Sequence, residues 1–439
     1  MRISVIGCGH LGIPHAAAMA ELGHEVIGVD TDADKIARLN RGECPIYETG
    51  LPELLARHTA TGRLRFTTDI AEAAEFAELH FLGVGTPIDS DGRSYDTGQV
   101  FGAVRQLAPH LKQPCTIVGK STVTVGTTRQ LTALVHRLAP AGEKADVVWN
   151  PEFLREGHAV EDSLRPDRIV AGLTTAEAEK AIRTVFAPIL ETGVPLFITT
   201  PETAELAKGA ANSFLGVKIS FMNAVSNMCD AAGGDVSQIV DILGVDVRIG
   251  KGSMSPGLGY GGGCLPKDIR AFTASAQKLG AADAATFLRA AEEINEHRTE
   301  VGLGLVVKAL GRPLAGARIT VWGAAFKPGT NDVRESPALS LAQALQTAGA
   351  VVTVHDPQAV STAMHRNPEL EYTDDLTASV DGADAVVLGT EWPEYRQADP
   401  GPLAGRTATP LMVDCRTTLD AARWRTAGWT LHQIGRPAH

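Results

Sequence analysis

The chain has 439 residues, of which 44% are hydrophobic and 21% charged, and its formal net charge is −11. This length is too great for one ordinary hydrophobic core, so we expect two or three domains of a soluble globular protein. The acidic balance argues against a general affinity for nucleic acid or anionic membranes, because both need clustered cations.

The start of the chain and its cysteines bear on the compartment. Residues 1–7 have the pattern of a buried strand and no apolar run is long enough to span a bilayer, so we expect no signal peptide and a cytosolic protein. The six cysteines form no CxxC pair, which argues against disulfides and against a zinc site. We expect no metal, and most cysteines should be small buried hydrophobes.

The first half of the chain alternates short β-branched runs with helical patterns, which is typical of a parallel sheet covered by helices. The predicted strands are Ile3–Ile6, Glu25–Val29, Glu78–Val84, Thr116–Lys120, Val147–Trp149 and Leu196–Thr199. The predicted helices follow Leu11, Ala71, Thr97, Thr127 and Thr175. The segment Asn40–Thr67, rich in glycine, proline and charge, is interpreted as an excursion from the sheet.

A glycine motif follows the first predicted strand and opens a helix. It reads Gly7-Cys8-Gly9-His10-Leu11-Gly12, and its glycines allow a tight turn and close approach to a pyrophosphate at the helix end. Asp30, at the end of the second strand, can accept hydrogen bonds from the adenosine ribose and would repel a 2′-phosphate, which favours NAD over NADP. Lys35 either reaches the ribose or is a solvated lysine.

Polar groups follow further predicted strands. Thr86 and Ser121-Thr122 stand at two strand ends, where they can face a ligand or cap a helix. After the next strand, Asn150-Pro151-Glu152-Phe153-Leu154-Arg155-Glu156 puts two carboxylates four residues apart, on one face if this segment is helical. Such spacings are more often solvated faces than active sites.

Two long helical patterns come next, over Pro201–Ala232 and about Ala282–Leu310. Helices of this length commonly join domains or pair subunits, although either can be a core helix. Lys208 and Asn212 share the four-residue spacing on the first of them and offer a cation and an amide to one spot.

The glycine-rich stretch Gly250–Pro266 between these helices must be a loop. It ends in Gly261-Gly262-Gly263-Cys264-Leu265-Pro266-Lys267-Asp268, where Pro266 suits the first turn of a helix. Cys264 would then precede unsatisfied helix N–H groups and lie near Lys267, which favours the nucleophilic thiolate. The alternative is a structural cysteine that ends a glycine-rich loop.

The third part of the chain echoes the first. Arg318-Ile319-Thr320-Val321-Trp322-Gly323 resembles Arg2–Gly7, which predicts a second Rossmann-like sheet without the glycine motif and therefore without a dinucleotide. Lys327 and Arg334 stand in turns that follow its first strand and can meet an anionic ligand.

Taken together, these segments resemble the UDP-glucose/GDP-mannose dehydrogenase family over essentially the whole chain. The motifs that carry the resemblance are GCGHLG, VGTP, KSTVTVGT, NPEFLREG, ELAKGAANSF, DVRIG, GYGGGCLPKD and FKPGTNDVRESP. The resemblance implies two Rossmann-like parallel-sheet domains joined by a long-helix region: an NAD-binding domain over residues 1–200, a helical dimerisation region with the cysteine loop over 201–311, and a nucleotide-sugar-binding domain over 312–439.

The resemblance also implies oxidation of a sugar C6 alcohol to an acid with two NAD reduced, and it assigns residues by motif. The implied catalytic residues are Cys264, Thr122, Glu152, Glu156, Lys208, Asn212 and Asp268. The implied cofactor-binding residues are Gly7, Gly9, Leu11, Gly12, Asp30, Lys35, Thr86, Thr122, Glu156, Lys267 and Arg334. The implied substrate-binding residues are Glu152, Phe153, Leu154, Lys208, Asn212, Arg248, Gly261 and Lys327, with Arg248 crossing to the neighbouring subunit of a homodimer.

The chain departs from the family pattern at Thr124, where proline is usual, at Gly263, where serine is usual, and at Asn331, where an acid is usual. The cysteine motif and the segment Asp162–Arg168 are more similar to the UDP-glucose branch than to the GDP-mannose branch. Alternatives are the same chemistry on GDP-mannose or another UDP-sugar, a two-electron dehydrogenase with a structural Cys264, or a catalytically silent nucleotide-sugar-binding protein.

Overall fold

The computed structural model describes residues 1–90, 92 and 94–437, and the chain forms two compact units. The first unit comprises Met1–Ala211 and Arg270–Leu279, and the second comprises Asn212–Ile269 and Gly280–His439. Each unit is built around its own sheet, which confirms the predicted fold class of two Rossmann-like domains with long helices in the middle of the chain. The predicted three-domain boundaries stay a prediction.

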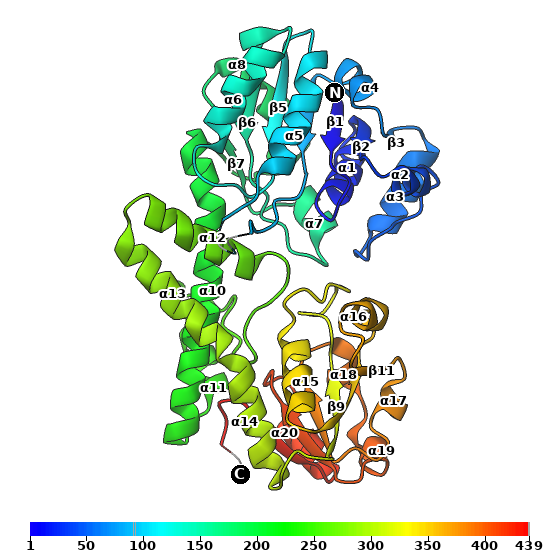
Figure 1. Ribbon diagram of the computed structural model, residues 1–439, viewed down its shortest axis with the longest axis vertical. Coiled ribbons are helices and arrows are strands. Elements are labelled where there is room, and N and C mark those ends of the chain that lie inside the picture. Colours follow the sequence, from blue (N-terminus) through cyan, green and yellow to red (C-terminus); the bar gives the residue numbers. More distant parts are fainter. Residues whose placement is uncertain (91, 93, 438–439) are drawn as a thin grey trace. The chain divides into compact units, whose positions relative to one another are not determined.

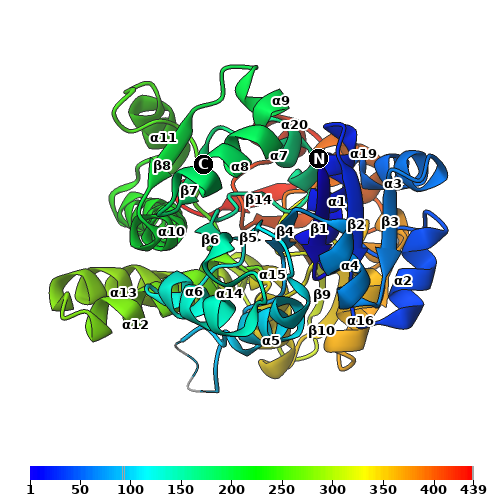
Figure 2. The same ribbon diagram turned by 90° about the horizontal axis from the view of Figure 1, so that it is seen from above.

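The first unit contains an eight-stranded sheet in the order β3-β2-β1-β4-β5-β6-β7-β8, in which neighbours are parallel except β6 and β7. Helices cover both faces, with α7 and α8 on one side and α4, α5 and α6 on the other (Figure 2). Its strands are β1 (Arg2–Ile6), β2 (Glu25–Val29), β3 (Leu64–Thr67), β4 (Leu79–Leu82), β5 (Cys115–Gly119), β6 (Ala145–Trp149), β7 (Ile169–Gly172) and β8 (Leu196–Thr199). Its helices are α1 (Gly12–Glu21), α2 (Ala33–Asn40), α3 (Leu51–Ala60), α4 (Ile70–Phe76), α5 (Gly98–Leu107), α6 (Thr127–Leu138), α7 (Ala159–Leu164), α8 (Ala176–Val185) and α9 (Ala187–Leu190).

The interpretation of Asn40–Thr67 as an excursion from the sheet was wrong. The segment contains helix α3, which buries Leu51, Leu54 and Leu55, and strand β3, which pairs with β2 at the edge of the sheet. Strand β3 alternates buried and half-buried residues and includes Arg65. Its sequence therefore lacks the continuous apolar run of a central parallel strand, which is why the pattern was missed.

The second unit contains a six-stranded parallel sheet in the order β11-β10-β9-β12-β13-β14. This is the strand order of β3 to β6 in the first unit, with β9 in the place of β1, so the predicted echo is confirmed. Its strands are β9 (Arg318–Trp322), β10 (Val351–His355), β11 (Glu371–Thr373), β12 (Ala385–Leu388), β13 (Leu411–Asp414) and β14 (Thr430–Gln433). The helices around it are α15 (Pro337–Thr347), α16 (Val360–Arg366), α17 (Leu376–Ser379), α18 (Pro393–Gln397), α19 (Pro400–Ala404) and α20 (Ala421–Thr426).

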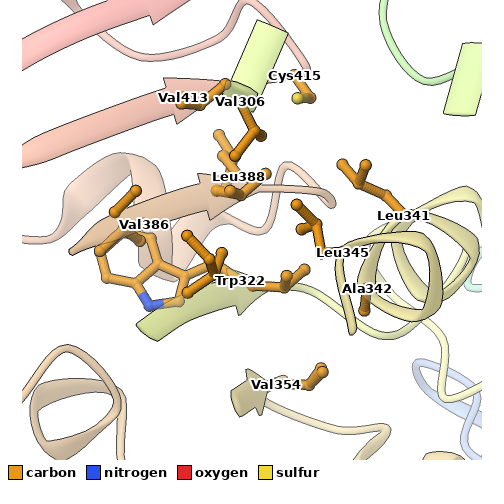
Figure 3. Packing of buried hydrophobic residues seen from close by; sticks show 14 of the residues in the cluster. Val306, Trp322, Leu341, Ala342, Leu345, Val354, Val386, Leu388, Val413 and Cys415 are labelled. Carbon is orange, nitrogen blue, oxygen red and sulfur yellow. The ribbon is translucent and has the colours of Figure 1, made fainter. Parts of the chain in front are cut away.

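One face of this second sheet packs against α14 (Arg298–Leu310) and α15. Figure 3 shows Leu341 and Leu345 of α15 beside Leu388 of the sheet, and Val306 of α14 beside Val413 of β13. Burial of apolar surface stabilises such a contact by about 25 cal/mol per Å2. This packing therefore holds α14 against the sheet.

The central helices are α10 (Pro201–Ala232), α11 (Val236–Gly244), α12 (Leu265–Lys278), α13 (Ala282–Glu296) and α14 (Arg298–Leu310). The long α10, one continuous green helix in Figure 1, has the predicted bounds. The second pattern is not one helix, because the chain breaks at His297, whose Nδ1 lies 2.6 Å from the Glu293 carbonyl oxygen. The break separates α13 from α14 and directs Arg298 into the core, where it is 1% exposed.

The acidic residue that ends the second strand differs between the two sheets. In the first sheet Asp30 accepts from the Cys8 N–H at 2.9 Å, and 13% of its side chain is exposed. In the second sheet Asp356 accepts from the N–H groups of Ala324 and Ala325, and only 1% of it is exposed. The carboxylate of Asp356 therefore braces its own turn and is not exposed to a ribose.

Candidate active site

The glycine turn of the first unit has the geometry that a dinucleotide requires. Gly7 has φ +96°, and a Cβ on Gly12 would stand 1.7 Å from the Gly7 carbonyl oxygen, so neither position tolerates a side chain. A Cβ on Gly9 would meet no atom within 4 Å, which leaves open space beside the turn. Helix α1 begins after Leu11 with no side-chain cap, so its first N–H groups suit a pyrophosphate.

Asp30 stands at the edge of this turn, as predicted. Its Oδ2 accepts from Cys8 N and from Lys35 Nζ, at 2.9 and 3.0 Å, so its carboxylate is oriented before any ribose binds. Lys35 is an ion-pair partner of Asp30, and its predicted role toward the ribose stays a prediction. Burial and the nearby Asp30 raise the pKa of Cys8 well above its usual range, so this thiol stays protonated.

The strand-end hydroxyls lie where parallel strands terminate. Thr86 and Thr122 are each 8% exposed, and Ser121 donates to the Val84 carbonyl oxygen at 2.6 Å, which ties the ends of β4 and β5 together. Next to them the buried Lys120 donates to Asn150 Oδ1 at 2.9 Å. Burial lowers the pKa of Lys120 to about 8.

The segment after β6 carries an ion pair. Glu152 Oε1 lies 3.3 Å from Lys208 Nζ, and both side chains are largely buried. Glu152 Oε2 accepts from the Leu154 N–H at 2.7 Å, which shapes the loop. Since residues 151–158 are not helical, the premise that Glu152 and Glu156 share a helix face was wrong. Phe153 stacks under the guanidinium of Arg168 at 3.9 Å.

Glu48 is a residue of this region that sequence reasoning missed. It is 7% exposed, and its two carboxylate oxygens each accept at 2.9 Å, from the N–H groups of Gly157 and Ala159. The carboxylate thus anchors the loop that carries Glu152 and Glu156 to the start of α7. A single glutamate in a loop produces no pattern, so only the three-dimensional structure reveals it.

In the second unit the cysteine motif forms the start of α12. Cys264 is exposed and its carbonyl oxygen accepts from the Asp268 N–H at 2.9 Å, so it takes the cap position that Pro266 predicted. The sulfur-bearing residue therefore stands at the positive end of a helix, where a thiolate is favoured. This position fits a nucleophile better than a core cysteine.

Asp268 is the buried acid of this cluster, with 1% of its side chain exposed. Asn212 Nδ2 donates to one of its oxygens at 2.6 Å, and Lys267 Nζ donates to the other at 2.7 Å. Lys208 and Asn212 both lie on α10, one turn apart as predicted. The predicted role of Lys267 toward the cofactor stays a prediction. In the structure its amine forms an ion pair with the carboxylate of Asp268.

The glycines before Cys264 are in contact with the turn that follows β9. Gly262 N–H donates to the Arg334 carbonyl oxygen at 2.9 Å. A Cβ on Gly261 would stand 2.0 Å from the Glu335 carbonyl oxygen, and one on Gly263 would stand 2.1 Å from the Arg334 guanidinium. Arg334 is held by Asp332, which accepts from its Nη2 at 2.6 Å. The structure therefore brings Gly261, Gly263 and Arg334 together beside Cys264.

Two further predicted residues differ in exposure: Lys327 is half-buried and Arg248 is exposed. Lys327 Nζ lies 5.5 Å from the ring of Phe326. Arg248 has 85% of its side chain exposed and pairs with Asp246. Within the described residues there is no cluster of three potential metal ligands, and no helix among them combines the length and apolarity of a membrane span.

Comparison with known proteins matches each part of the chain to the same family. Residues 1–190 match the NAD binding domain of the UDP-glucose/GDP-mannose dehydrogenases, residues 202–297 their central domain, and residues 320–421 their UDP binding domain. A UDP-glucose 6-dehydrogenase of Pseudomonas aeruginosa is 40% identical over 100% of this chain and 98% of its own length. The chain belongs to the UDP-glucose/GDP-mannose dehydrogenase family.

Other members of the UDP-glucose/GDP-mannose dehydrogenase family are also similar over their whole length. A UDP-glucose 6-dehydrogenase of Rhizobium meliloti is 38% identical over 100% of both chains. A solved UDP-glucose dehydrogenase from Pyrobaculum islandicum has a TM-score of 0.90 at 36% identity, covering 99% of this chain and 98% of that one. The predicted NAD-dependent dehydrogenase is confirmed at the level of the family, and the open glycine turn with its oriented Asp30 fits that cofactor.

Proposed function

We propose that this dehydrogenase oxidises the C6 alcohol of UDP-glucose to a carboxylate, forming UDP-glucuronate with two NAD reduced per sugar. The observation that carries the proposal is the start of α12, where an exposed Cys264 caps the helix and a buried Asp268 is held by Asn212 and Lys267. The relatives at 40% and 38% identity are UDP-glucose 6-dehydrogenases, which supports this sugar over other nucleotide hexoses.

The first oxidation needs a base for the hydroxyl proton. Gly7, Gly9 and Asp30 at the glycine turn of the first unit would hold NAD, which would supply the hydride acceptor for both oxidations. Asp268 accepts the hydroxyl proton through a water that Thr122 helps to hold. Its two hydrogen-bond donors leave it oriented for this task.

The second oxidation needs the thiolate. Cys264 attacks the aldehyde carbon and forms a thiohemiacetal, which loses a second hydride to become a thioester. Lys208 and Asn212, one turn apart on α10, stabilise the negative charge on the former carbonyl oxygen. Glu156 activates the water that hydrolyses the thioester, with Glu152 helping to hold it. One water is consumed, and two hydrides and three protons leave.

Binding of the nucleotide sugar falls to the loops around these groups. We assign the phosphates to Lys327 and the sugar to the loop of Phe153 and Leu154 and to the backbone of Gly261. We assign the cofactor to Gly7, Gly9, Leu11, Gly12, Asp30, Lys35 and Thr86, together with Thr122, Glu156, Lys267 and Arg334.

The decisive test is the amount of NADH formed per sugar by the wild type and by Cys264→Ser. The wild type should form two NADH and an acid. The variant should still bind NAD and UDP-glucose but accumulate an ester or stop before the acid, because serine is a poorer nucleophile and its ester a poorer acyl donor. Unchanged acid production by the variant, or aldehyde release with one NADH by the wild type, would exclude the thioester route.

A panel of nucleotide hexoses tests the substrate separately. UDP-glucose, GDP-mannose and the N-acetylated UDP-hexosamines are each supplied at equal concentration while NADH is monitored. We expect the largest kcat/KM with UDP-glucose, and a larger value with any other sugar would reassign the substrate while leaving the chemistry intact.

We also propose a homodimer that works in the cytoplasm. Helices α10 and α11 expose large apolar side chains, among them Phe214 at 64%, Phe221 at 59%, Met228 at 69% and Ile242 at 68%. An apolar face of this kind is expected to be covered by a partner, and a second copy of the chain would bring in Arg248. The six cysteines are free thiols, as a reducing compartment would keep them.

A further inference from the structure

The backbone that leads to the nucleophile is held by two side chains at the junction of α13 and α14. Asn295, at the end of α13, accepts from the Tyr260 N–H at 2.8 Å and donates to the Tyr260 carbonyl oxygen at 3.1 Å. One amide therefore satisfies both polar groups of a single backbone residue. This pairing restricts the position of Tyr260 in two directions, as a strand neighbour would.

Arg298, at the start of α14, holds the same stretch three residues earlier. Its Nε donates to the Gly257 carbonyl oxygen at 2.7 Å, and its Nη1 donates to Asn227 Oδ1 at 2.7 Å. The N–H of the same residue, Gly257, donates to Asn223 Oδ1 at 2.8 Å. The guanidinium is 1% exposed, and burial lowers its pKa to about 10, so a charged group has been desolvated for this contact.

The backbone of Gly257–Tyr260 is also restricted at Gly259. Gly259 has φ +88°, and a Cβ there would stand 2.2 Å from Asn295 Oδ1. Arg416 Nη1 donates to the Gly259 carbonyl oxygen at 3.1 Å from the other side. Gly261, Gly262 and Gly263 follow directly and have no side chains to anchor them before Cys264. Apart from the hydrogen bond from the Gly262 N–H to the Arg334 carbonyl oxygen, the position of Cys264 therefore depends on contacts made four to seven residues earlier.

We propose that Asn295 and Arg298 are positioning residues for the reaction: they hold Gly257–Tyr260 so that Gly261 and the thiol of Cys264 meet the sugar in a reactive geometry. This inference rests on the proposed function. Neither side chain touches the reacting atoms. Misplacement of a reacting group by about 1 Å can lower a rate by about 100-fold, so loss of either side chain should affect turnover more than folding.

The test compares Asn295→Ala and Asn295→Asp with a control variant. The control weakens a contact between α13, the helix that carries Asn295, and α10, at a place away from the loop. The aspartate keeps an acceptor for the Tyr260 N–H but has no donor for its carbonyl oxygen, so it should fall between alanine and the wild type. Ser220→Ala is the control, because Ser220 donates to the Ala291 carbonyl oxygen at 2.6 Å between α10 and α13. Arg298→Lys is the corresponding conservative change for the second residue.

Four quantities are measured: kcat, the KM values for UDP-glucose and NAD, the melting temperature, and the rate at which iodoacetamide alkylates Cys264 without substrate. We expect Asn295→Ala to lower kcat about tenfold or more and to raise the KM for UDP-glucose. The KM of this variant for NAD should stay within about twofold of the wild-type value. The rate at which iodoacetamide alkylates its Cys264 should differ from the wild-type rate. Ser220→Ala should lower the melting temperature with wild-type kinetics.

Wild-type kcat, sugar KM and alkylation rate in Asn295→Ala, well below its melting temperature, would overturn the proposal. If Arg298→Lys had the same kinetics as Ser220→Ala, Arg298 would not be a positioning residue, and the proposal would hold for Asn295 alone. The alkylation rate needs no nucleotide sugar, so it decides the positioning role even if the wild type fails to oxidise UDP-glucose, a result that would overturn the proposed function alone. Peptide mass spectrometry assigns the alkylated residue; Cys264 is exposed, Cys44 and Cys115 are half-buried, and Cys8, Cys229 and Cys415 are buried.

Discussion

Gly263 directly precedes Cys264, the proposed nucleophile, at a position where the sequence resemblance leads us to expect serine. The guanidinium of Arg334 occupies the space of a side chain there, with three of its atoms between 2.1 and 2.4 Å from a Cβ on residue 263. We predict that Gly263→Ser displaces Arg334 and raises the KM for NAD about three- to tenfold, a loss of about 1 kcal/mol of binding. Steady-state kinetics with NAD as the varied substrate measures this.

Gly252→Ser is the matched control for that variant. It lies in the same glycine-rich loop, and a Cβ there would meet no atom within 4 Å. Its kinetics should equal those of the wild type. A Gly263→Ser variant with an unchanged KM for NAD would show that Arg334 either moves aside without cost or takes no part in cofactor binding.

Lys120 makes stability depend on pH. Its pKa falls from 10.5 to about 8, mainly through burial and further through Lys208, while Glu152 opposes the shift. Between these two values the unfolded chain binds a proton that the folded chain does not, so the free energy of unfolding rises with pH. We predict that the stability of the wild type relative to Lys120→Met rises by about 2 kcal/mol from pH 7 to about pH 9.5.

Urea unfolding of both proteins at several pH values measures this difference. Lys112→Met serves as the control, because that lysine has 65% of its side chain exposed and pairs with Glu75 at the surface. Its difference from the wild type should stay nearly constant over the same range. A constant difference for Lys120→Met as well would mean that Lys120 keeps its charge in the folded protein.

At the residue level, sequence reasoning found groups that belong to spaced motifs and missed groups that act alone. Cys264, Asp268 and Asn212 stand in recognisable patterns, and the structure brings them together. Glu48 and Asn295 each bind the backbone of a segment distant in sequence. Nothing local distinguishes such a residue from a solvated one, so it becomes visible only when its partner is known.

At the level of elements, helix α6 is held by a carboxylate from another helix. Glu205 of α10 is 3% exposed and accepts from the Gly126 N–H at 2.7 Å, the Thr128 N–H at 2.7 Å and the Thr128 hydroxyl at 2.6 Å. Burial raises the pKa of Glu205 even so. The loop with Thr122 leads directly into this helix start, so the contact fixes one end of that loop.

We predict that Glu205→Gln destabilises the protein by about 1–3 kcal/mol, because an amide N–H₂ cannot accept from the donors that one carboxylate oxygen now serves. Thermal or urea unfolding measures the loss. Glu177→Gln is the control, since Glu177 is an exposed acid in the first turn of α8. Equal stability of the two variants would mean that a neutral side chain satisfies the helix start as well as the carboxylate does.

The helices and strands that could be predicted share one property: the hydrophobic pattern of their sequence follows which residues of the element are buried. Strands β1, β2, β5 and β6 are buried over four of their five residues and were found. The edge strand β3 and the break at His297 were missed, because the first is half exposed and the second depends on a side chain that binds a carbonyl group. The break at His297 reflects local competition between side chain and backbone, which hydrophobic periodicity does not record.

At the scale of the whole chain, the second sheet repeats the order of the first six strands of the first sheet, but the turns after their first strands differ in what they can bind. The first keeps an oriented, partly exposed Asp30 beside an open glycine turn, and the second buries Asp356 against its own turn and against Trp392 Nε1 at 3.1 Å. The same topology thus presents a dinucleotide site once. In the second sheet the corresponding turn is followed by the segment of Arg334, which meets the glycines before Cys264.

The proposed dimer makes the assembly part of the active site, because Arg248 would serve the neighbouring subunit's substrate. Within the described residues its side chain is 85% exposed and pairs with Asp246, two residues away, so we expect its removal to leave the packing of its own subunit intact. Arg248→Ala and Cys264→Ala should therefore each fold and dimerise, and each homodimer should lack efficient turnover.

A heterodimer of these two variants, purified through a different tag on each chain, should regain about half the activity of the wild-type dimer. One of its sites combines an intact Cys264 with the intact Arg248 of the other chain, while the second site lacks both. If Arg248 served its own subunit, each site would lack one group and no activity would return. Size-exclusion chromatography confirms the dimer, and initial NADH rates at saturating UDP-glucose then decide between the two arrangements, since neither variant alone can produce the recovered rate.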